Sequence, residues 1–262
     1  MFSDYVNILG ISYSTCDDKD VLSRIDESVR TKIKLTIIQP HFFHSVLGRS
    51  DPNIFGLYQK YDIALPDGYG MYLAGKFLYG KEKSFRQIFN GTDLYELLLK
   101  EANLRRWRIF FFGDTEHTLQ ALRHKFEGLF PDLVIAGTHQ GFVDPGDETV
   151  ISAINASNAD ILLIGMGTPK QDTWLWKHYH ELRVPVMMTV GAGIGFISGE
   201  KLRAPKTLRK VHLEWLFRFF QEPRRLWRRY FLGIPKFIFY IFIQKVRQKQ
   251  EEQRIYRYRS QR

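Results

Sequence analysis

The 262-residue sequence contains a single cysteine, Cys16, which excludes an internal disulfide and is typical of a protein in a reducing compartment. Its longest apolar runs fall far below the roughly 18 residues of a membrane-spanning helix. The first ten residues lack a basic start followed by a long apolar run, so we expect no signal peptide. We find no fixed-period repeat and no low-complexity linker. These absences predict a globular cytoplasmic protein.

Acidic residues are scarce in residues 200–262, which we call the C-terminal segment. It carries eighteen Lys and Arg against five Asp and Glu, whereas residues 1–199 carry twenty basic and twenty-three acidic residues. This asymmetry indicates an anionic partner, either nucleic acid or a membrane surface. We therefore expect two parts, an α/β body over 1–199 and a basic, amphipathic helical appendage over 200–262.

The pattern of the C-terminal segment favours a membrane surface. Apolar residues at helical spacing predict one amphipathic helix over 206–221. Glu222-Pro223 would end it and begin a second helix, which Gly233 and Pro235 would end in turn. The apolar run Phe237–Ile243 is too short to span a bilayer but suits its interface.

The second predicted helix has a cationic face with apolar and aromatic residues opposite, which suits an anionic lipid surface. The alternative is a pair of ordinary packing helices with solvated arginines. The cationic face consists of Arg224, Arg225, Arg228 and Arg229.

The body alternates short apolar runs with amphipathic helical patterns. Continuous apolar strands of this kind, separated by helices, predict an α/β fold with a doubly wound, mainly parallel, Rossmann-like sheet. The predicted strands are Val6–Ile11, Leu35–Ile38, Asp62–Leu65, Arg108–Phe112, Leu133–Ala136, Asp160–Ile164 and Pro185–Val190.

Glycine-rich and polar turns follow most of these strands. In parallel sheets ligands bind beyond the carboxyl ends of the strands, and helix N-termini there attract phosphates. For each glycine taken alone, a plain tight turn is the simpler explanation. The turns are Gln39-Pro40, Pro66–Gly68, Phe112–Asp114, His139–Phe142, Gly165–Asp172 and Gly191–Gly195.

Three other patterns are weaker. Asp18-Lys19-Asp20 has the spacing of a metal-binding DxD motif, but a helix cap at Asp18 explains it better. His41 and His44 are one helical turn apart without a further ligand, so a zinc site is not expected there. Gly191–Gly195 imitates part of a dinucleotide fingerprint but follows the last strand and lacks the later acidic residue.

Six motifs occur along the chain in this order: Asp67-Gly68 with Gly70, Gly91–Leu94, Gly165–Asp172 with Trp174, Arg203–Pro205, Glu214–Leu216 with Arg218, and Glu222–Arg224. The WecG/TagA/CpsF glycosyltransferases have these motifs in the same order, and the sequence resembles that family from about Ile8 to Pro235. The resemblance implies an inverting hexosyltransferase, independent of metal and cofactor. Its donor would be a UDP-sugar and its acceptor a sugar on undecaprenyl diphosphate, in surface polysaccharide or teichoic acid synthesis.

The resemblance also implies roles for individual residues. Asp67 matches the proposed general base, which takes the proton of the attacking hydroxyl; without the family, a turn-capping aspartate is the simpler explanation. The four arginines of the cationic face would meet the membrane or the acceptor. The substrate-binding candidates are Gln39, Arg86, Asn90, Gly91, Gln140, Gly167, Lys170, Gln171, Gly191 and Arg203.

Four departures from the family pattern lie near the expected donor site. Gln39 stands where Asn is usual, Asp172 where Glu is usual, and Ile194-Gly195 where Phe-Asp is frequent; Ile88 replaces an arginine, with Arg86 close by. N-acetylmannosamine is the commonest donor sugar of the family. These departures leave glucose or another hexose open.

Two other classes of protein could use parts of this sequence. A nucleic-acid-binding enzyme would use the basic segment for phosphate contacts, and a nicotinamide-dependent oxidoreductase would use the doubly wound sheet. Neither accounts for the ordered motifs. We therefore expect a peripheral enzyme on the inner face of the plasma membrane that binds no nucleic acid. Its oligomeric state, including a homo-oligomer, stays open.

Overall fold

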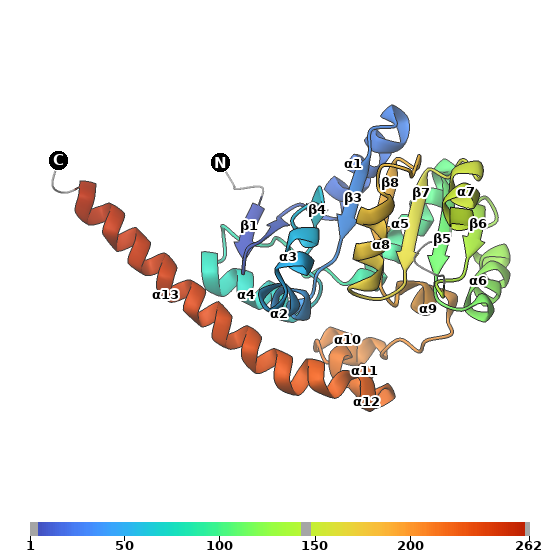
Figure 1. Cartoon of the computed structure of the whole chain (residues 1–262). Coiled ribbons are helices and arrows are strands. Elements are labelled where there is room, and N and C mark those ends of the chain that lie inside the picture. The colour runs from blue at the N-terminus through green and yellow to red at the C-terminus, as the bar shows by residue number, and fades with distance from the viewer. Residues whose placement is uncertain (1–4, 143–147, 260–262) are drawn as a thin grey trace.

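A six-stranded parallel sheet forms the centre of the protein, whose computed structural model describes residues 5–142 and 148–259 (Figure 1). The strand order is β4-β3-β8-β7-β5-β6, and every neighbouring pair is parallel. This confirms the predicted doubly wound α/β fold. The strands are β3 (Leu35–Ile38), β4 (Ile63–Ala64), β5 (Arg108–Gly113), β6 (Val134–His139), β7 (Ile161–Gly165) and β8 (Val186–Thr189).

Helices cover both faces of the sheet because its central strands are apolar on both sides. In β5, Ile109 and Phe111 enter one hydrophobic core, while Phe110 and Phe112 enter the other. This period of two is what a strand between two helical layers requires. One layer contains α1 (Asp18–Thr31), α5 (Gly91–Arg105), α6 (Glu116–Leu129) and α9 (Gly193–Ser198); the other contains α7 (Glu148–Ala156) and α8 (Lys170–His178).

The predicted strand Val6–Ile11 is wrong, because the chain reverses within it. Leu9 and Gly10 both have positive φ, 52° and 92°, which is the turn geometry that matches the twist of an antiparallel hairpin. The result is a separate two-stranded sheet of β1 (Tyr5–Ile8) and β2 (Ile11–Ser14). It packs with the second layer, together with α2 (Phe42–Ser50), α3 (Pro52–Tyr58) and α4 (Tyr69–Tyr79).

The C-terminal segment differs from the sequence prediction in two places. The helix expected over 206–221 is divided into α10 (Lys206–Lys210) and α11 (Glu214–Gln221), because His212 between them has a φ of 59°. Gly233 and Pro235 do not end a helix. Gly233 keeps helical φ and ψ, and Pro235 lies in the first turn of α13 (Gly233–Arg259).

The predicted four-arginine face is wrong for Arg229. After α12 (Pro223–Trp227), one turn of π-helix, η1 (Arg228–Leu232), changes the angular spacing of side chains. Arg224, Arg225 and Arg228 are exposed, whereas Arg229 is half-buried and faces inward. The basic cluster is therefore split between the surface and the interior.

The long helix α13 passes α4 and the β1–β2 hairpin and extends beyond the body (Figure 1). Phe237 and Ile241 on one side of α13 are buried in the hydrophobic core, while Ile238, Phe239 and Phe242 are exposed. No helix within residues 5–142 and 148–259 is both long and apolar enough to cross a membrane.

Replacing Gly113 at the end of β5 tests how closely the strand ends pack. Its φ is 138°, and a Cβ there would lie 2.4 Å from the carbonyl carbon and oxygen of Gly165. We expect Gly113→Ala to cost about 3 kcal/mol, because neither backbone can move away easily. Thermal unfolding should show a melting temperature lower by roughly 10 °C.

Gly128 in α6 is the matched control, since nothing lies within 4 Å of a Cβ placed there. Gly128→Ala should raise stability by about 0.5 kcal/mol through the lower entropy of the unfolded chain. Equal melting temperatures for the two variants would contradict the tight approach of β5 and β7.

Candidate active site

The turns after β5, β6, β7 and β8 meet at the carboxyl edge of the sheet. Lys170 Nζ donates to the carbonyl oxygen of Gly141 at 3.1 Å, and the side-chain oxygen of Gln171 accepts from the Gly191 N–H at 3.0 Å. The Gly167 carbonyl, just before α8, accepts from the Gln171 N–H at 3.0 Å. Three candidates from the turn after β7 and one from the turn after β8 thus lie together at this edge, where free helix N–H groups suit a phosphate.

Gln39 and Gly91 face each other near the same edge of the sheet. Gln39 is 7% exposed, and within the described residues neither polar atom of its side chain has a hydrogen-bond partner. A Cβ at Gly91 would lie 2.8 Å from the Gln39 side-chain oxygen. A buried amide without partners costs free energy unless a ligand satisfies it, which supports a binding role for Gln39.

Three other residues singled out in the sequence make contacts within the protein. Gln140 closes a turn on Phe142, with hydrogen bonds of 2.9 and 2.6 Å to its backbone. Arg86 lies on the surface, 3.6 Å from the Asp20 carboxylate. Asp172 points into the core, where it accepts from the Tyr61 hydroxyl at 2.7 Å and burial raises its pKa to about 7.

Asp67 lies at the end of the segment after β4. One carboxylate oxygen accepts from the Gly91 N–H at 3.1 Å, and the Asp67 N–H donates to the Pro40 carbonyl at 3.2 Å. Burial raises the pKa of the Asp67 carboxyl, while Arg218 and the Gly91 hydrogen bond oppose that rise. The Asp67 side chain also lines a cavity. A carboxylate held in this way can accept a proton from a hydroxyl.

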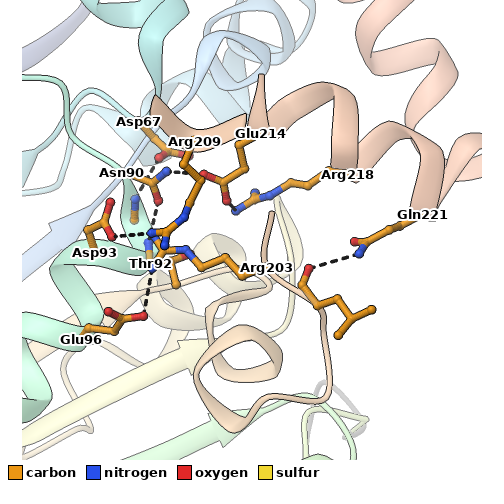
Figure 2. A network of polar contacts seen from close by, with 12 residues as sticks. Asp67, Asn90, Thr92, Asp93, Glu96, Arg203, Arg209, Glu214, Arg218 and Gln221 are labelled. Carbon is orange, nitrogen blue, oxygen red and sulfur yellow. Dashed lines mark hydrogen bonds and ion pairs between the residues drawn. The ribbon is translucent and has the colours of Figure 1, made fainter. Parts of the chain in front are cut away.

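A polar network joins α5 to the C-terminal segment next to Asp67 (Figure 2). Asn90 caps α5 by accepting from the Thr92 N–H, and its amide donates to Glu214 on α11 at 2.6 Å. Glu214 is 9% exposed and also binds Arg218 at 3.1 Å. Asn90 therefore holds a buried carboxylate from the segment against the body.

Arg203 belongs to the same junction. Its guanidinium binds Asp93 and, at 2.9 Å, Glu96, both on α5 (Figure 2). Arg209 approaches Asp93 to 3.5 Å. These pairs fix the start of the C-terminal segment to α5, so the Arg203 charge is already balanced by two carboxylates.

A cavity of about 580 Å³ opens between the body and the C-terminal segment. One part, which we call the charged end, lies beside the carboxyl edge of the sheet. The other, the apolar groove, runs between α4 and α13. The charged end contains His41, Asp67, Arg209, Glu214, Arg218 and Arg229. The apolar groove contains Leu73, Phe77, Ile234, Ile238, Ile241 and Phe242.

The cavity thus changes from charged to apolar along the axis of α13. Arg229 precedes the helix, and the groove residues then extend from Ile234 to Phe242, about 12 Å at 1.5 Å per residue. Phe77, Ile238 and Phe242 are 50–62% exposed, so the groove is open at its rim. An exposed apolar groove joined to a charged pocket fits an amphipathic ligand.

No group of three or more His, Cys, Asp and Glu side chains in the described parts of the chain is arranged to hold a metal ion. The Asp18-Lys19-Asp20 pattern serves to begin α1, as expected, but the cap is Asp17 rather than Asp18. Asp17 accepts from the Asp20 N–H at 3.0 Å, and Asp20 accepts from the Asp17 N–H at 3.1 Å.

The sequence matches the glycosyl transferase WecG/TagA/CpsF family over residues 6–251. The chain belongs to this family. It is therefore a glycosyltransferase, and the resemblance seen in the motifs is confirmed. The WecG/TagA/CpsF assignment, unlike a nucleic-acid-binding enzyme or a nicotinamide oxidoreductase, accounts for the motifs in their order.

Two relatives within the WecG/TagA/CpsF family carry the same name, N-acetylglucosaminyldiphosphoundecaprenol N-acetyl-beta-D-mannosaminyltransferase. The protein of Bacillus spizizenii is 33% identical over 188 residues, which is 72% of this chain and 71% of that protein. The protein of Staphylococcus aureus strain MW2 is 32% identical over 151 residues, 58% of each chain. The match to the staphylococcal protein thus spans somewhat more than half its length.

Sequence patterns do not predict that several charged-end residues line the cavity. Arg218 and Glu214 were noted only as parts of a family motif, and His41 only as an improbable zinc ligand. The amphipathic pattern of 206–221 does not indicate that Arg209 and Arg218 line a cavity, as both do. Only His41 had a usable signal, because it closely follows β3 at the edge where ligands bind.

The Asn90–Glu214 hydrogen bond gives a test of how the segment is held. Asn90→Asp keeps a helix cap but brings a second carboxylate against Glu214, so we expect α11 to detach more readily. Stability should fall by about 1–2 kcal/mol. Limited proteolysis should cleave the connection before α11 faster than in the unaltered protein.

Glu214→Gln in the Asn90→Asp background is the rescue variant. The new amide at position 214 can donate to the new carboxylate at position 90, which reverses the direction of the original bond and restores it. Proteolysis of the double variant should return close to the original rate. Unchanged proteolysis and melting of Asn90→Asp alone would show that this bond does not hold the segment.

Proposed function

We propose that the protein transfers an N-acetylmannosamine-type sugar from its UDP-linked donor to a sugar carried by undecaprenyl diphosphate, with inversion at the anomeric carbon. The activity named for the relatives from B. spizizenii and S. aureus supports this acceptor and this donor sugar. Such a reaction serves the synthesis of a bacterial surface polysaccharide or teichoic acid.

The polarity of the cavity carries the proposal. A polyprenyl diphosphate sugar has an anionic head and a long apolar chain. The charged end supplies three arginines, Arg209, Arg218 and Arg229, to an anionic head, and the groove between α4 and α13 supplies apolar contact to a chain. The open rim lets a chain longer than the groove continue into a lipid surface.

The donor fits the carboxyl edge of the sheet. Its glycine turns allow the backbone to approach a diphosphate, and Lys170 adds a positive charge that can offset the charge of the departing UDP. The unpartnered amide of Gln39 offers a donor and an acceptor to the sugar or the uridine. Because Gln39 and Gly195 depart from the family pattern, another hexose is the competing donor.

The chemistry assigns the base role to Asp67. The acceptor hydroxyl attacks the anomeric carbon, a new C–O bond forms, and the bond from that carbon to the UDP oxygen breaks. Asp67 takes the hydroxyl proton, and the electron pair leaves with UDP. The raised pKa of Asp67 strengthens it as a base at neutral pH.

The exposed part of the cationic face supports attachment to an anionic leaflet. Arg224, Arg225 and Arg228 are exposed, and so are Trp227 and Phe231 beside them. Each basic residue near such a surface contributes about 1 kcal/mol. The protein would then lie on the inner face of the plasma membrane.

The direct experiment incubates the protein with a panel of UDP-sugars and a polyprenyl-diphosphate-linked N-acetylglucosamine, and weighs the product. We expect a mass increase of one N-acetylhexosamine with UDP-N-acetylmannosamine and little product with UDP-glucose. Transfer of glucose alone would correct the donor, and no transfer from any UDP-sugar would refute the proposal.

Replacing Asp67 tests the base. Asp67→Asn keeps the oxygen that accepts from Gly91 but cannot take a proton, so we expect kcat to fall roughly 10²-fold or more with UDP affinity unchanged. In the unaltered enzyme, kcat/KM should fall as the pH drops through a pKa above the ordinary value of about 4. Near-normal turnover of the variant would remove Asp67 from this role.

Replacing Ile238 tests the apolar groove. Ile238 is 62% exposed, so Ile238→Asp should leave the fold intact while placing a charge where the chain would lie. We expect KM for a long-chain acceptor to rise about tenfold, with little change for an analogue bearing a short alkyl chain. Activity is measured in detergent, so that membrane attachment does not contribute.

Phe239→Asp is the matched control, because Phe239 is equally exposed on the same helix but lies outside the cavity lining. It should keep the original KM in detergent. The groove assignment fails when both variants behave alike, or when Ile238→Asp affects long and short acceptors equally.

A further inference from the structure

The ring of His41 is held in one tautomer by the backbone. His41 precedes α2 and caps it, because its Nδ1 accepts from the Phe43 N–H at 3.1 Å. Burial and the nearby Arg229 lower the pKa of His41 well below its ordinary value, so the ring is neutral. A neutral imidazole that accepts at Nδ1 carries its proton at Nε2. The Nε2–H is therefore a donor.

His44 supports this arrangement from the same helix. Its Nδ1 accepts from the His41 N–H at 3.2 Å, and its Nε2 lies 3.0 Å from the Thr168 hydroxyl oxygen. The two imidazole rings meet edge to face, with centroids 4.3 Å apart. The orientation of the His41 ring is thus fixed by one backbone hydrogen bond and by the packed His44 ring, which a second backbone hydrogen bond holds in place, as a preorganised binding group requires.

The Nε2–H of His41 faces the guanidinium of Arg229, so two donors meet without an acceptor between them. Arg229 is half-buried, and its Nε has no hydrogen-bond partner within the described residues. Among the described residues no acidic side chain forms an ion pair with Arg229, although the Asp67 carboxylate acts on it at longer range. Donors that converge in this way are poorly satisfied alone but well satisfied by an anion with several oxygens.

The pair lies where the charged end joins the apolar groove. Phe42, next to His41, packs against Tyr230 and Phe237 at centroid distances of 6.2 and 5.9 Å. Phe237 precedes the groove residue Ile238 on α13. An anion at this junction would share the cavity with the apolar groove and with Asp67.

We infer that the Nε2–H of His41 and the guanidinium of Arg229 bind the diphosphate of the lipid-linked acceptor, an assignment that rests on the proposed function. The continuous apolar groove favours the acceptor diphosphate over that of the UDP donor, which carries no apolar chain. Arg218 adds charge nearby but is already paired with Glu214 at 3.1 Å.

Two substitutions separate binding from helix capping. His41→Asn retains an oxygen that accepts from the Phe43 N–H but has no donor in the Nε2 position. His41→Gln can place an amide N–H near the Nε2 position but is a poor cap. The probe is geranylgeranyl diphosphate, whose binding to the full chain in detergent is measured by calorimetry.

We expect His41→Asn to melt within about 2 °C of the unaltered protein and to bind the probe roughly tenfold more weakly or worse. His41→Gln should melt roughly 2–4 °C lower, yet bind within about threefold of the original affinity. A purely structural role for His41 predicts the opposite order of affinities, and that order would overturn the assignment.

Two control ligands identify which diphosphate the site binds. Geranylgeraniol, which has the chain but no diphosphate, should bind the unaltered protein and His41→Asn equally. UDP affinity should also stay unchanged. A loss of UDP affinity in His41→Asn would assign His41 to the donor and overturn the inference.

The binding assay also separates this inference from the proposed function, because it needs no sugar transfer. Absence of sugar transfer combined with His41-dependent binding of the probe would refute the proposed function and leave the diphosphate site standing. Transfer to the lipid acceptor combined with full affinity of His41→Asn for the probe would refute the site alone.

Discussion

The docking of the C-terminal segment on α5 is the constraint on which the site depends. Glu214 would be a costly buried charge without a partner, and the Asn90 amide and Arg218 stabilise it together. Their geometry sets where α11 lies, and α11 closes one wall of the cavity. Arg203, bound to Asp93 and Glu96, holds the start of the segment at the same place. An open sheet edge thereby becomes an enclosed site.

The parallel sheet supplies the other wall. All six strands end at one edge, and their turns approach so closely that side chains are excluded at Gly113 and Gly165. Backbone N–H groups and helix N-termini are thereby concentrated at that edge, where a diphosphate would need them. Asp67 lies between this edge and the cavity, bound to Gly91 on one side and lining the cavity on the other. This placement suits a group that acts between two substrates.

The distribution of arginines explains how one basic segment can serve two purposes. Arg229, in the π-helical turn η1, is half-buried and lines the cavity, while Arg224, Arg225 and Arg228 stay in solvent. Burial lowers the pKa of the Arg229 guanidinium, because a charge away from water is destabilised unless an anion accompanies it. An exposed arginine has no such need. The inward residue is therefore suited to a specific anion, and the outward residues to a diffuse anionic surface.

The sequence by itself determined the parallel α/β fold and the family. Apolar runs such as Phe110–Phe112 favour strands between two helical layers, and the ordered motifs need no coordinates. The hairpin at Leu9-Gly10 and the break at His212 depend on positive φ values that non-glycine residues rarely adopt, so local patterns did not predict them. The cavity was decided by tertiary structure alone. Asp67, His41, Glu214 and Ile238 come from four separate elements of the chain, and only the packing of α11 and α13 on the body brings them to one cavity.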